Sequence, residues 1–389
     1  MREVLALDDP AQLRILAADP SRLAELPRPL LLDEWQRFPP SWDIVRRAVD
    51  HGASAGDFLI TGSAASDAPV HSGAGRIVRL RMRPMSLTER GISSARVSLR
   101  ALLDGRRPRL GGRTRVGLED YVDEVLASGF PAIRRARGRA RTLQLDAYID
   151  RIVDRDFPEQ GRAVRRPHVL RRWLAAYAAA TATSTSLEKV RDAATAGEAE
   201  KPSRATVLDY REILERLWIL DPIPAWQPSR NRLGVLRVAP TMHLADPAIG
   251  ARLLGVDAPA LLGGVRAEDA LGTEVSIGGD RPLLGQLFES LVALDVRVYA
   301  QAVDARVGHL RAKSGAREVD LIVSRADERV LAIEVKLTAD PSDDDAEHLN
   351  WLQEQMGDRL LDAVIVTTGR EAYRRPDGVG VVPAALLGP

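Results

Sequence analysis

The sequence contains no cysteine, which excludes disulfide bonds, thiolate metal sites and cysteine nucleophiles. It has no apolar run near the about eighteen residues that a membrane span requires, and Met1–Leu5 lacks a signal-peptide core. The net charge of +1 gives no global attraction to nucleic acid, so any such binding has to come from a local patch. We therefore expect a cytoplasmic protein with no membrane partner. Its 389 residues suffice for roughly two to four domains.

Lysine is nearly absent as well. The chain has four, at Lys189, Lys201, Lys313 and Lys336. None of them follows a glycine, so the sequence holds no Gly-Lys-Ser/Thr, the motif with which a P-loop grips nucleotide phosphates. Lys313-Ser314 comes closest, but Ala312 precedes it. A nucleotide bound by this chain would lack that phosphate cradle.

Two short apolar runs that end in polar residues lie near the N-terminus, at Pro29–Glu34 and Asp57–Ser63. Such runs are typical of strands buried on both faces of a parallel sheet. A helical pattern separates them, so the order strand, helix, strand predicts an α/β fold. Ligands of such sheets bind beyond the carboxyl ends of the strands, where Asp33, Glu34 and Ser63 would lie together.

Further patterns extend this predicted domain over residues 1–90. Val4–Leu7 and the alternating segment Ile77–Met82 are predicted strands. Residues 11–26 predict two short helical segments separated at Pro20, because proline disfavours helix in the residue before it. The domain is therefore predicted to be a parallel sheet with helical crossovers.

The middle of the chain is predicted to be helical, with a lid-like region over residues 91–160 and a second unit over residues 161–256. The second unit shows three helical patterns and then a proline-flanked strand, an order that describes a winged helix. Ser203 is a credible N-cap for its third helix, on which Arg204 and Arg211 would contact nucleic acid. A helical packing module that never meets DNA is the alternative.

Residues 257–389 predict an α/β domain. A helix is expected at Leu284–Leu294, a strand start at Val296–Tyr299, a second helix at Leu349–Leu360 and a buried strand at Ala363–Thr368. Between the helices we expect three strands, at His309–Ala312, Glu318–Val323 and Val330–Lys336.

The strands of this last domain carry a second candidate site. Asp320 and Glu334 lie on neighbouring predicted strands, and alternation places Lys336 on the same face as Glu334. Glu289, on the preceding helix, would add a third carboxylate. Two carboxylates about 4 Å apart repel by about 4 kcal/mol at an effective dielectric near 20, so they favour a cation between them. We expect Glu289, Asp320 and Glu334 to bind Mg²⁺ and Lys336 to act on a phosphate. A surface ion pair, or a fold kept for packing, is the alternative.

An ordered set of short motifs runs through nearly the whole chain. The motifs are Leu30–Gln36, Leu59–Ser63, Gly73–Arg76, Ser128–Pro131, Arg155–Asp156, Leu287–Ser290, Arg317–Asp320 and Ile333–Lys336. In this order they resemble the prokaryotic AAA-type ATPases that carry a C-terminal domain of unknown function 4143. The last two motifs also resemble the PD-(D/E)xK nuclease superfamily and its restriction-endonuclease-like core.

The resemblance implies a truncated P-loop NTPase core in residues 1–90 and a restriction-endonuclease-like C-terminal domain, and between them the helical pattern predicts the winged-helix middle. It assigns Asp33 to Mg²⁺, Glu34 to water activation, Ser63 to the sensor position and Arg76 to a phosphate. It further implies oligomerisation, DNA as a partner, and ATP as a ligand where an upstream P-loop exists.

The missing P-loop is the departure from this family, so we expect at most marginal ATP hydrolysis by this chain. Either the true start lies upstream or the chain is a degenerate member, and the sequence does not choose. Two functional classes therefore stay open. One is an ATPase-family protein that acts on nucleic acid, and the other is a non-catalytic DNA-binding or interaction protein. A metal-dependent nuclease acting through the C-terminal domain is a further alternative.

Overall fold

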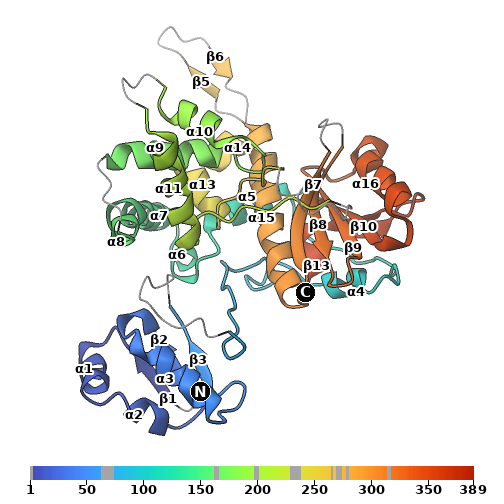
Figure 1. Ribbon diagram of the computed structural model, residues 1–389. Helices are drawn as coiled ribbons and strands as arrows, with labels where there is room; N and C mark the ends of the chain where they lie inside the picture. The colour runs from blue at the N-terminus through green and yellow to red at the C-terminus, as the bar shows by residue number, and fades with distance from the viewer. Residues whose placement is uncertain are drawn as a thin grey trace. The chain divides into compact units, whose positions relative to one another are not determined.

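A computed structural model describes residues 3–62, 74–161, 166–196, 201–227, 238–263, 266–268, 274–276, 280–312 and 317–389 (Figure 1). The chain divides into two compact units: Met1–Met82 with Glu212–Trp218, and Arg83–Arg211 with Ile219–Pro389. We call them unit 1 and unit 2. The predicted mixed α/β class is confirmed. None of the described helices is both long enough and apolar enough to cross a membrane.

Unit 1 is built on a parallel three-stranded sheet with the order β1–β2–β3. Its strands are β1 (Glu3–Ala6), β2 (Leu30–Asp33) and β3 (Phe58–Ile60), and its helices are α1 (Pro10–Ala18), α2 (Arg22–Glu25), η1 (Trp35–Arg37) and α3 (Pro40–Asp50). The break predicted at Pro20 separates α1 from α2. The central strand β2 is the one that ends in the acidic pair.

The core of unit 1 lies between one face of this sheet and the helices. Leu30 and Leu32 alternate onto that face of β2 and are fully buried. They form one apolar cluster with Leu16 of α1, Leu23 of α2 and Val45 of α3. Each burial of this kind contributes about 1.5–3 kcal/mol, which fixes the register of β2 and hence the position of the residues that follow it.

The strand predicted at Ile77–Met82 is wrong, since the structure has no strand there. Val78, Leu80 and Met82 are instead 85%, 75% and 90% exposed. Apolar alternation specifies a strand when one face of the segment is buried and its edge is paired. Neither condition is met within the described residues of unit 1.

Helices dominate the middle of the chain. They are α5 (Leu118–Ala127), α6 (Pro131–Arg135), α7 (Arg139–Arg151), the π-turn η2 (Ile152–Asp156), α8 (Phe157–Glu159), α9 (Pro167–Ala179), α10 (Leu187–Ala194), α11 (Arg204–Arg216), α13 (Pro247–Leu253) and α14 (Ala258–Leu262). The three predicted helices of residues 161–256 appear as α9, α10 and α11. The strand expected after them is reduced to isolated antiparallel bridges, Leu220 with Leu244 and Ile223 with Thr241.

The C-terminal part of unit 2 contains a six-stranded mixed sheet with the order β11–β12–β10–β9–β8–β7. Its strands are β7 (Arg306–Arg311), β8 (Glu318–Ser324), β9 (Val330–Lys336), β10 (Leu360–Thr367), β11 (Tyr373–Arg374) and β12 (Gly380–Pro383). The strands β7, β8 and β9 form an antiparallel meander, and β10 adds to β9 in parallel. The three strands and the buried strand predicted for this domain are therefore confirmed.

Shorter elements accompany this sheet. They are β4 (Val97–Ser98), which pairs with β13 (Leu387–Gly388), the hairpin of β5 (Arg266–Glu268) and β6 (Glu274–Ser276), and the helices α4 (Leu99–Leu103), α15 (Arg281–Gln301), α16 (Asp343–Met356), η3 (Gly357–Arg359) and η4 (Ala384–Leu386). The long helix α15 and α16 frame the sheet in Figure 1.

Side chains from β9 alternate between two apolar cores. Leu331 and Ile333 pack in the core that includes α15, whereas Val330 and Ala332 pack in the core that includes α16. A strand covered by helices on both faces reads as a continuous apolar run, as this one does. Polar residues appear on β9 where the strand ends, at Glu334 and Lys336.

The strand start predicted at Val296–Tyr299 is wrong. These residues continue α15, which is 21 residues long, and Val296 and Tyr299 are buried within it. Valine-rich segments favour strands locally, but packing of a helical face overrides a propensity difference of less than about 1 kcal/mol per residue. The helix therefore continues about two turns beyond Leu294, where its sequence pattern ended.

Candidate functional site

The acidic pair lies at the carboxyl end of β2, as predicted. Asp33 is the last residue of β2, and its Oδ1 accepts a hydrogen bond from Thr61 Oγ1 at 2.5 Å. Thr61 follows β3, and its backbone carbonyl accepts from Trp35 N at 3.1 Å. The ends of two neighbouring strands are thus tied together around a half-buried carboxylate. Thr61 is not among the predicted site residues, although it stands in the motif that contains Ser63.

Glu34 follows Asp33 in an unusual backbone conformation. Its φ of 53° lies in the left-handed region, which costs a residue other than glycine about 1–3 kcal/mol and is found at functional sites. The Glu34 carboxylate accepts a hydrogen bond from the Gln36 side chain. The turn and this bond hold the carboxylate beside the strand end.

Of the other two predicted nucleotide residues, Arg76 alone lies within the described structure. Ser63 lies outside the described residues. Arg76 forms an ion pair with Asp50 and donates to the Ala74 carbonyl at 3.0 Å. Asp50 is the last residue of α3, the helix that connects the parallel strands β2 and β3. A phosphate-facing role for Arg76 stays a prediction.

The second predicted site begins with an irregularity in β8. Gly308 pairs with Ile322 and Leu310 with Val319, so β8 has one extra residue at this point. Asp320 lies in this bulge, and its Oδ2 accepts a hydrogen bond from the backbone N–H of Val335 on β9 at 2.8 Å. A bulge re-aims a side chain, and here it turns the Asp320 carboxylate toward the end of β9.

Glu334 and Lys336 lie on the same face of β9, as strand alternation predicts. Lys336 Nζ lies 2.9 Å from Glu334 Oε1. Glu334 is 4% exposed, and its second oxygen, Oε2, is buried without a hydrogen-bond partner in the described structure. Burying a carboxylate oxygen without a partner is unfavourable. That atom is therefore positioned to accept a ligand that the protein does not itself supply.

Glu289 of α15 interacts electrostatically with Asp320, Glu334 and Lys336. Burial raises the pKa of the Asp320 carboxyl, and the neighbouring charge of Glu334 raises it further. Burial also raises the pKa of Glu289, with added repulsion from Asp320 and Glu334. Burial lowers the pKa of the Lys336 ammonium, but attraction to Glu334 and Asp320 outweighs it, so the net shift is upward. The structure thus brings Asp320, Glu334 and Lys336 together at the end of β9, and Glu289 lies near enough for its charge to interact with theirs.

The carboxylates of Asp320 and Glu334 meet some of the requirements of a site for a hard divalent cation. Within the described parts of the chain, no group of three or more histidine or acidic side chains is arranged to hold a metal ion. Mg²⁺ nevertheless often takes one or two carboxylates and keeps several waters. Asp320 and the buried Oε2 of Glu334 supply oxygens of that kind.

The two predicted nucleic-acid residues lie on α11. They are seven positions apart, which is about two helical turns, so they lie on the same side of the helix. The Arg204 side chain is 80% exposed and lies 3.6 Å from Glu188, whereas Arg211 is half-buried. One of the two is therefore presented fully to solvent.

A buried polar pair that the sequence analysis did not single out lies between the 241–244 segment and α15. His243 Nδ1 lies 2.9 Å from Ser290 Oγ, and both residues are 3% exposed. The adjoining cavity, which Asp221 and Arg297 also line, measures about 10 Å³. A space of that size is at the limit for one water molecule and excludes an organic substrate.

Comparisons with known families divide the chain into three matched segments. Residues 3–90 match an AAA domain, residues 118–260 match a domain of unknown function, DUF8612, and residues 284–387 match a domain of unknown function, DUF4143. The comparison with curated proteins and with solved structures found no match. The acidic pair on β2 falls in the first segment, and the carboxylate cluster falls in the third.

Proposed function

Because the chain is an AAA-type protein with a C-terminal DUF4143 domain, we propose that it binds ATP and Mg²⁺ at the carboxyl end of β2. The observation that carries this proposal is the placement of Asp33 and Glu34 beside Thr61, where two adjacent parallel strands end. Ligands of open α/β sheets bind at this end of the strands.

Each residue would have a separate task toward the nucleotide. Asp33, held by Thr61, would position the metal ion through water, and Glu34 would orient the water that attacks the terminal phosphate. Bound Mg²⁺ would neutralise charge on the phosphates. From the family resemblance we also propose that Ser63 occupies the sensor position and that Arg76 contacts a phosphate.

Turnover of ATP by the full chain tests the proposal. We expect weak Mg²⁺-dependent ATP binding that Asp33→Asn abolishes. We also expect marginal hydrolysis, because the printed sequence has no Gly-Lys-Ser/Thr to grip the phosphates. Glu25→Gln, an exposed substitution in the same unit, is the matched control. ATP binding that Asp33→Asn leaves unchanged would overturn the site, and robust turnover lost in Glu34→Gln would overturn the expected low activity.

A second candidate function rests on the convergence of Glu289, Asp320, Glu334 and Lys336. We propose that this cluster is a metal-dependent nuclease site of the PD-(D/E)xK type. Its support is the buried, unpartnered Oε2 of Glu334 beside the Asp320 carboxylate. Asp320 and Glu334 would hold Mg²⁺ or Mn²⁺, Glu289 would add negative charge, and Lys336 would stabilise charge that develops on a phosphate.

Thermal unfolding with and without Mn²⁺ tests the metal site separately from any cleavage. A bound cation raises the melting temperature by mass action. Asp320→Asn and Glu334→Gln should remove that gain, and Glu354→Gln, an exposed glutamate of α16, should keep it. Lys336→Ala should retain metal stabilisation but lose cleavage of DNA or RNA. A melting temperature indifferent to millimolar metal would favour a plain ion pair.

Oligomerisation is proposed from the family resemblance alone. The remaining part of the proposal is contact with DNA. Its support is the order α9, α10, α11 followed by antiparallel bridges, which matches a winged helix, and the exposed Arg204. Duplex binding at low salt should weaken as salt rises, and Arg204→Glu with Arg211→Glu should weaken it for all sequences alike. Absence of any shift at low salt would leave a packing module.

A further inference from the structure

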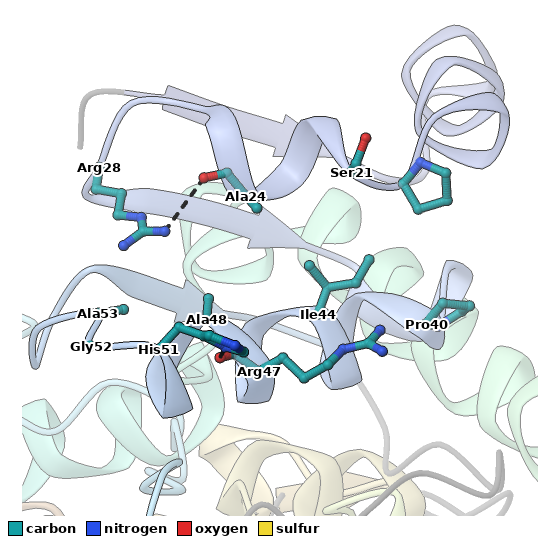
Figure 2. Close-up of a pocket in the computed structure, with 11 residues that line it drawn as sticks. Ser21, Ala24, Arg28, Pro40, Ile44, Arg47, Ala48, His51, Gly52 and Ala53 are labelled. Atoms are coloured by element: carbon teal, nitrogen blue, oxygen red, sulfur yellow. Dashed lines mark hydrogen bonds between the residues drawn. The ribbon is translucent and has the colours of Figure 1, made fainter.

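A cavity of about 700 Å³ lies between α2 and α3 in unit 1. Figure 2 shows its two facing walls. Ser21, Ala24 and Arg28 belong to α2 and the residues that flank it, and Ile44, Arg47, Ala48 and His51 belong to α3 and its end. Pro20, Pro40, Gly52 and Ala53 complete the lining. The cavity is thus made by a helix–helix groove and not by the ends of the strands.

The ionisable residues that line the cavity are all basic. Arg28, Arg47 and His51 line the cavity, and no aspartate or glutamate is among its lining residues. The Arg47 side chain is exposed and makes no hydrogen bond or ion pair within the described residues. An exposed guanidinium without a partner over a concave surface attracts oxyanions and offers them several donors.

The other two basic groups are held in place by the protein. Arg28 lies 3.4 Å from Asp57 and 4.9 Å from the centre of the Phe58 ring, and it donates to the Ala24 carbonyl at 3.4 Å. His51 Nδ1 donates to the Arg47 carbonyl at 2.6 Å, which fixes the ring at the end of α3. Both side chains are therefore anchored at the rim and need little reordering on binding.

The remaining walls are apolar. Ile44 and Ala48 face Ala24 across the cavity, and Pro20 and Pro40 are also among its lining residues. Sites for small organic ligands measure about 300–1,000 Å³ and combine apolar walls with a few polar groups that fix orientation. This cavity meets both conditions.

We propose that the cavity binds a small organic anion that joins a phosphate, carboxylate or sulfonate group to an apolar or aromatic body. Arg47 contacts the oxyanion, with Arg28 and His51 beside it, and the apolar body lies against Ile44 and Ala48. The site is separate from Asp33 and Glu34, because the groove lies between α2 and α3. It is therefore independent of the proposed ATP site.

Fluorescence titration of the full chain with anilinonaphthalene sulfonate, a probe that has both parts, tests this site. We expect saturable binding of one probe per chain. Arg47→Glu should weaken it by about tenfold or more, because it replaces attraction by repulsion. Arg14→Glu, an equivalent reversal at an exposed arginine of α1 outside the lining, should change it by less than about twofold.

Two further measurements complete the test. Ala48→Trp fills the cavity without changing its charge, so it should abolish binding, and thermal melts verify that each variant is folded. Inorganic phosphate should displace the probe if Arg47 holds the oxyanion. Equal weakening by Arg47→Glu and Arg14→Glu, unsaturable binding in the wild-type chain, or displacement by an acidic peptide but not by phosphate would overturn the proposal.

Discussion

The ammonium nitrogen of Lys336 lies 2.9 Å from Oε1 of Glu334, two residues earlier on β9. The carboxylate is nearly inaccessible to water, while the Lys336 side chain is 32% exposed. Asp320 and Glu289 add their negative charge to the same place. Lys336 is therefore the cation that offsets a group of buried carboxylates, whatever further function the group has.

Removal of this cation should destabilise the protein more at high pH than at low pH. Burial raises the pKa of Glu334, and Lys336 opposes that rise. In Lys336→Met the carboxylates lose the cation that favours their charged forms, and a higher pH charges more of them, so the loss should be about 1–3 kcal/mol at pH 8 and smaller at pH 5. Urea unfolding at both pH values measures this. Lys189→Met, an exposed control on α10, should show no such difference.

Asp295 predicts a second pH effect. Burial raises the pKa of this carboxyl to about 7, although Leu87 N donates to it at 2.9 Å. Because the pKa is higher in the folded chain, the protonated Asp295 contributes to the free energy of unfolding. That contribution is fully present below about pH 4 and is lost as the pH rises through about 7. Asp295→Asn should therefore be more stable than wild type at pH 8 and lose that advantage at pH 4. A gain independent of pH, or one matched by the exposed Asp358→Asn, would contradict this account.

His243 should act in the opposite direction. Burial lowers the pKa of its imidazole to about 3, with added repulsion from Arg297 and His309. The unfolded chain protonates the His243 imidazole near pH 6.5, whereas the folded chain keeps it neutral. The contribution of neutral His243 to the free energy of unfolding is therefore fully present above pH 6.5 and is lost as the pH falls toward 3. His243→Gln should flatten the acid limb of a stability–pH profile. His168→Gln, at an exposed position of α9, should leave the slope unchanged.

Asp246 joins three donors in the interior of unit 2. Its Oδ2 accepts from Ser128 Oγ at 2.7 Å and from Gly129 N at 2.8 Å, and its Oδ1 accepts from Ala248 N at 2.9 Å. Asp246→Ala would leave buried donors without partners at a cost of about 1–3 kcal/mol each. We expect a loss of at least about 3 kcal/mol in chemical unfolding, against about 1 kcal/mol for Ser128→Ala. Similar losses in the two variants would show that the carboxylate is not the central acceptor.

The spacing of apolar residues was sufficient to predict a strand where buried residues recur at a regular period along the chain. The run Val330–Lys336 is apolar until Glu334, and this predicted both a strand covered on two faces and the shared face of Glu334 and Lys336. The apolar run that ends at Asp33 predicted a parallel strand with its acidic pair at the carboxyl end, but only one face of this strand is fully buried, since Leu31 is half-buried between Leu30 and Leu32. These features depend on residues within one element, and the sequence contains them completely.

The sequence by itself determined the strand that carries each acidic residue, the pairing of Glu334 with Lys336, and the lack of a Gly-Lys-Ser/Thr motif. The tertiary structure decided that an extra residue in β8 turns Asp320 to Val335 N, that Arg76 pairs with Asp50, and that the segment after Val296 stays helical. These outcomes depend on partners distant in sequence. Periodicity specifies which face of an element is buried, but the packing of all elements together selects the residue that lies against it.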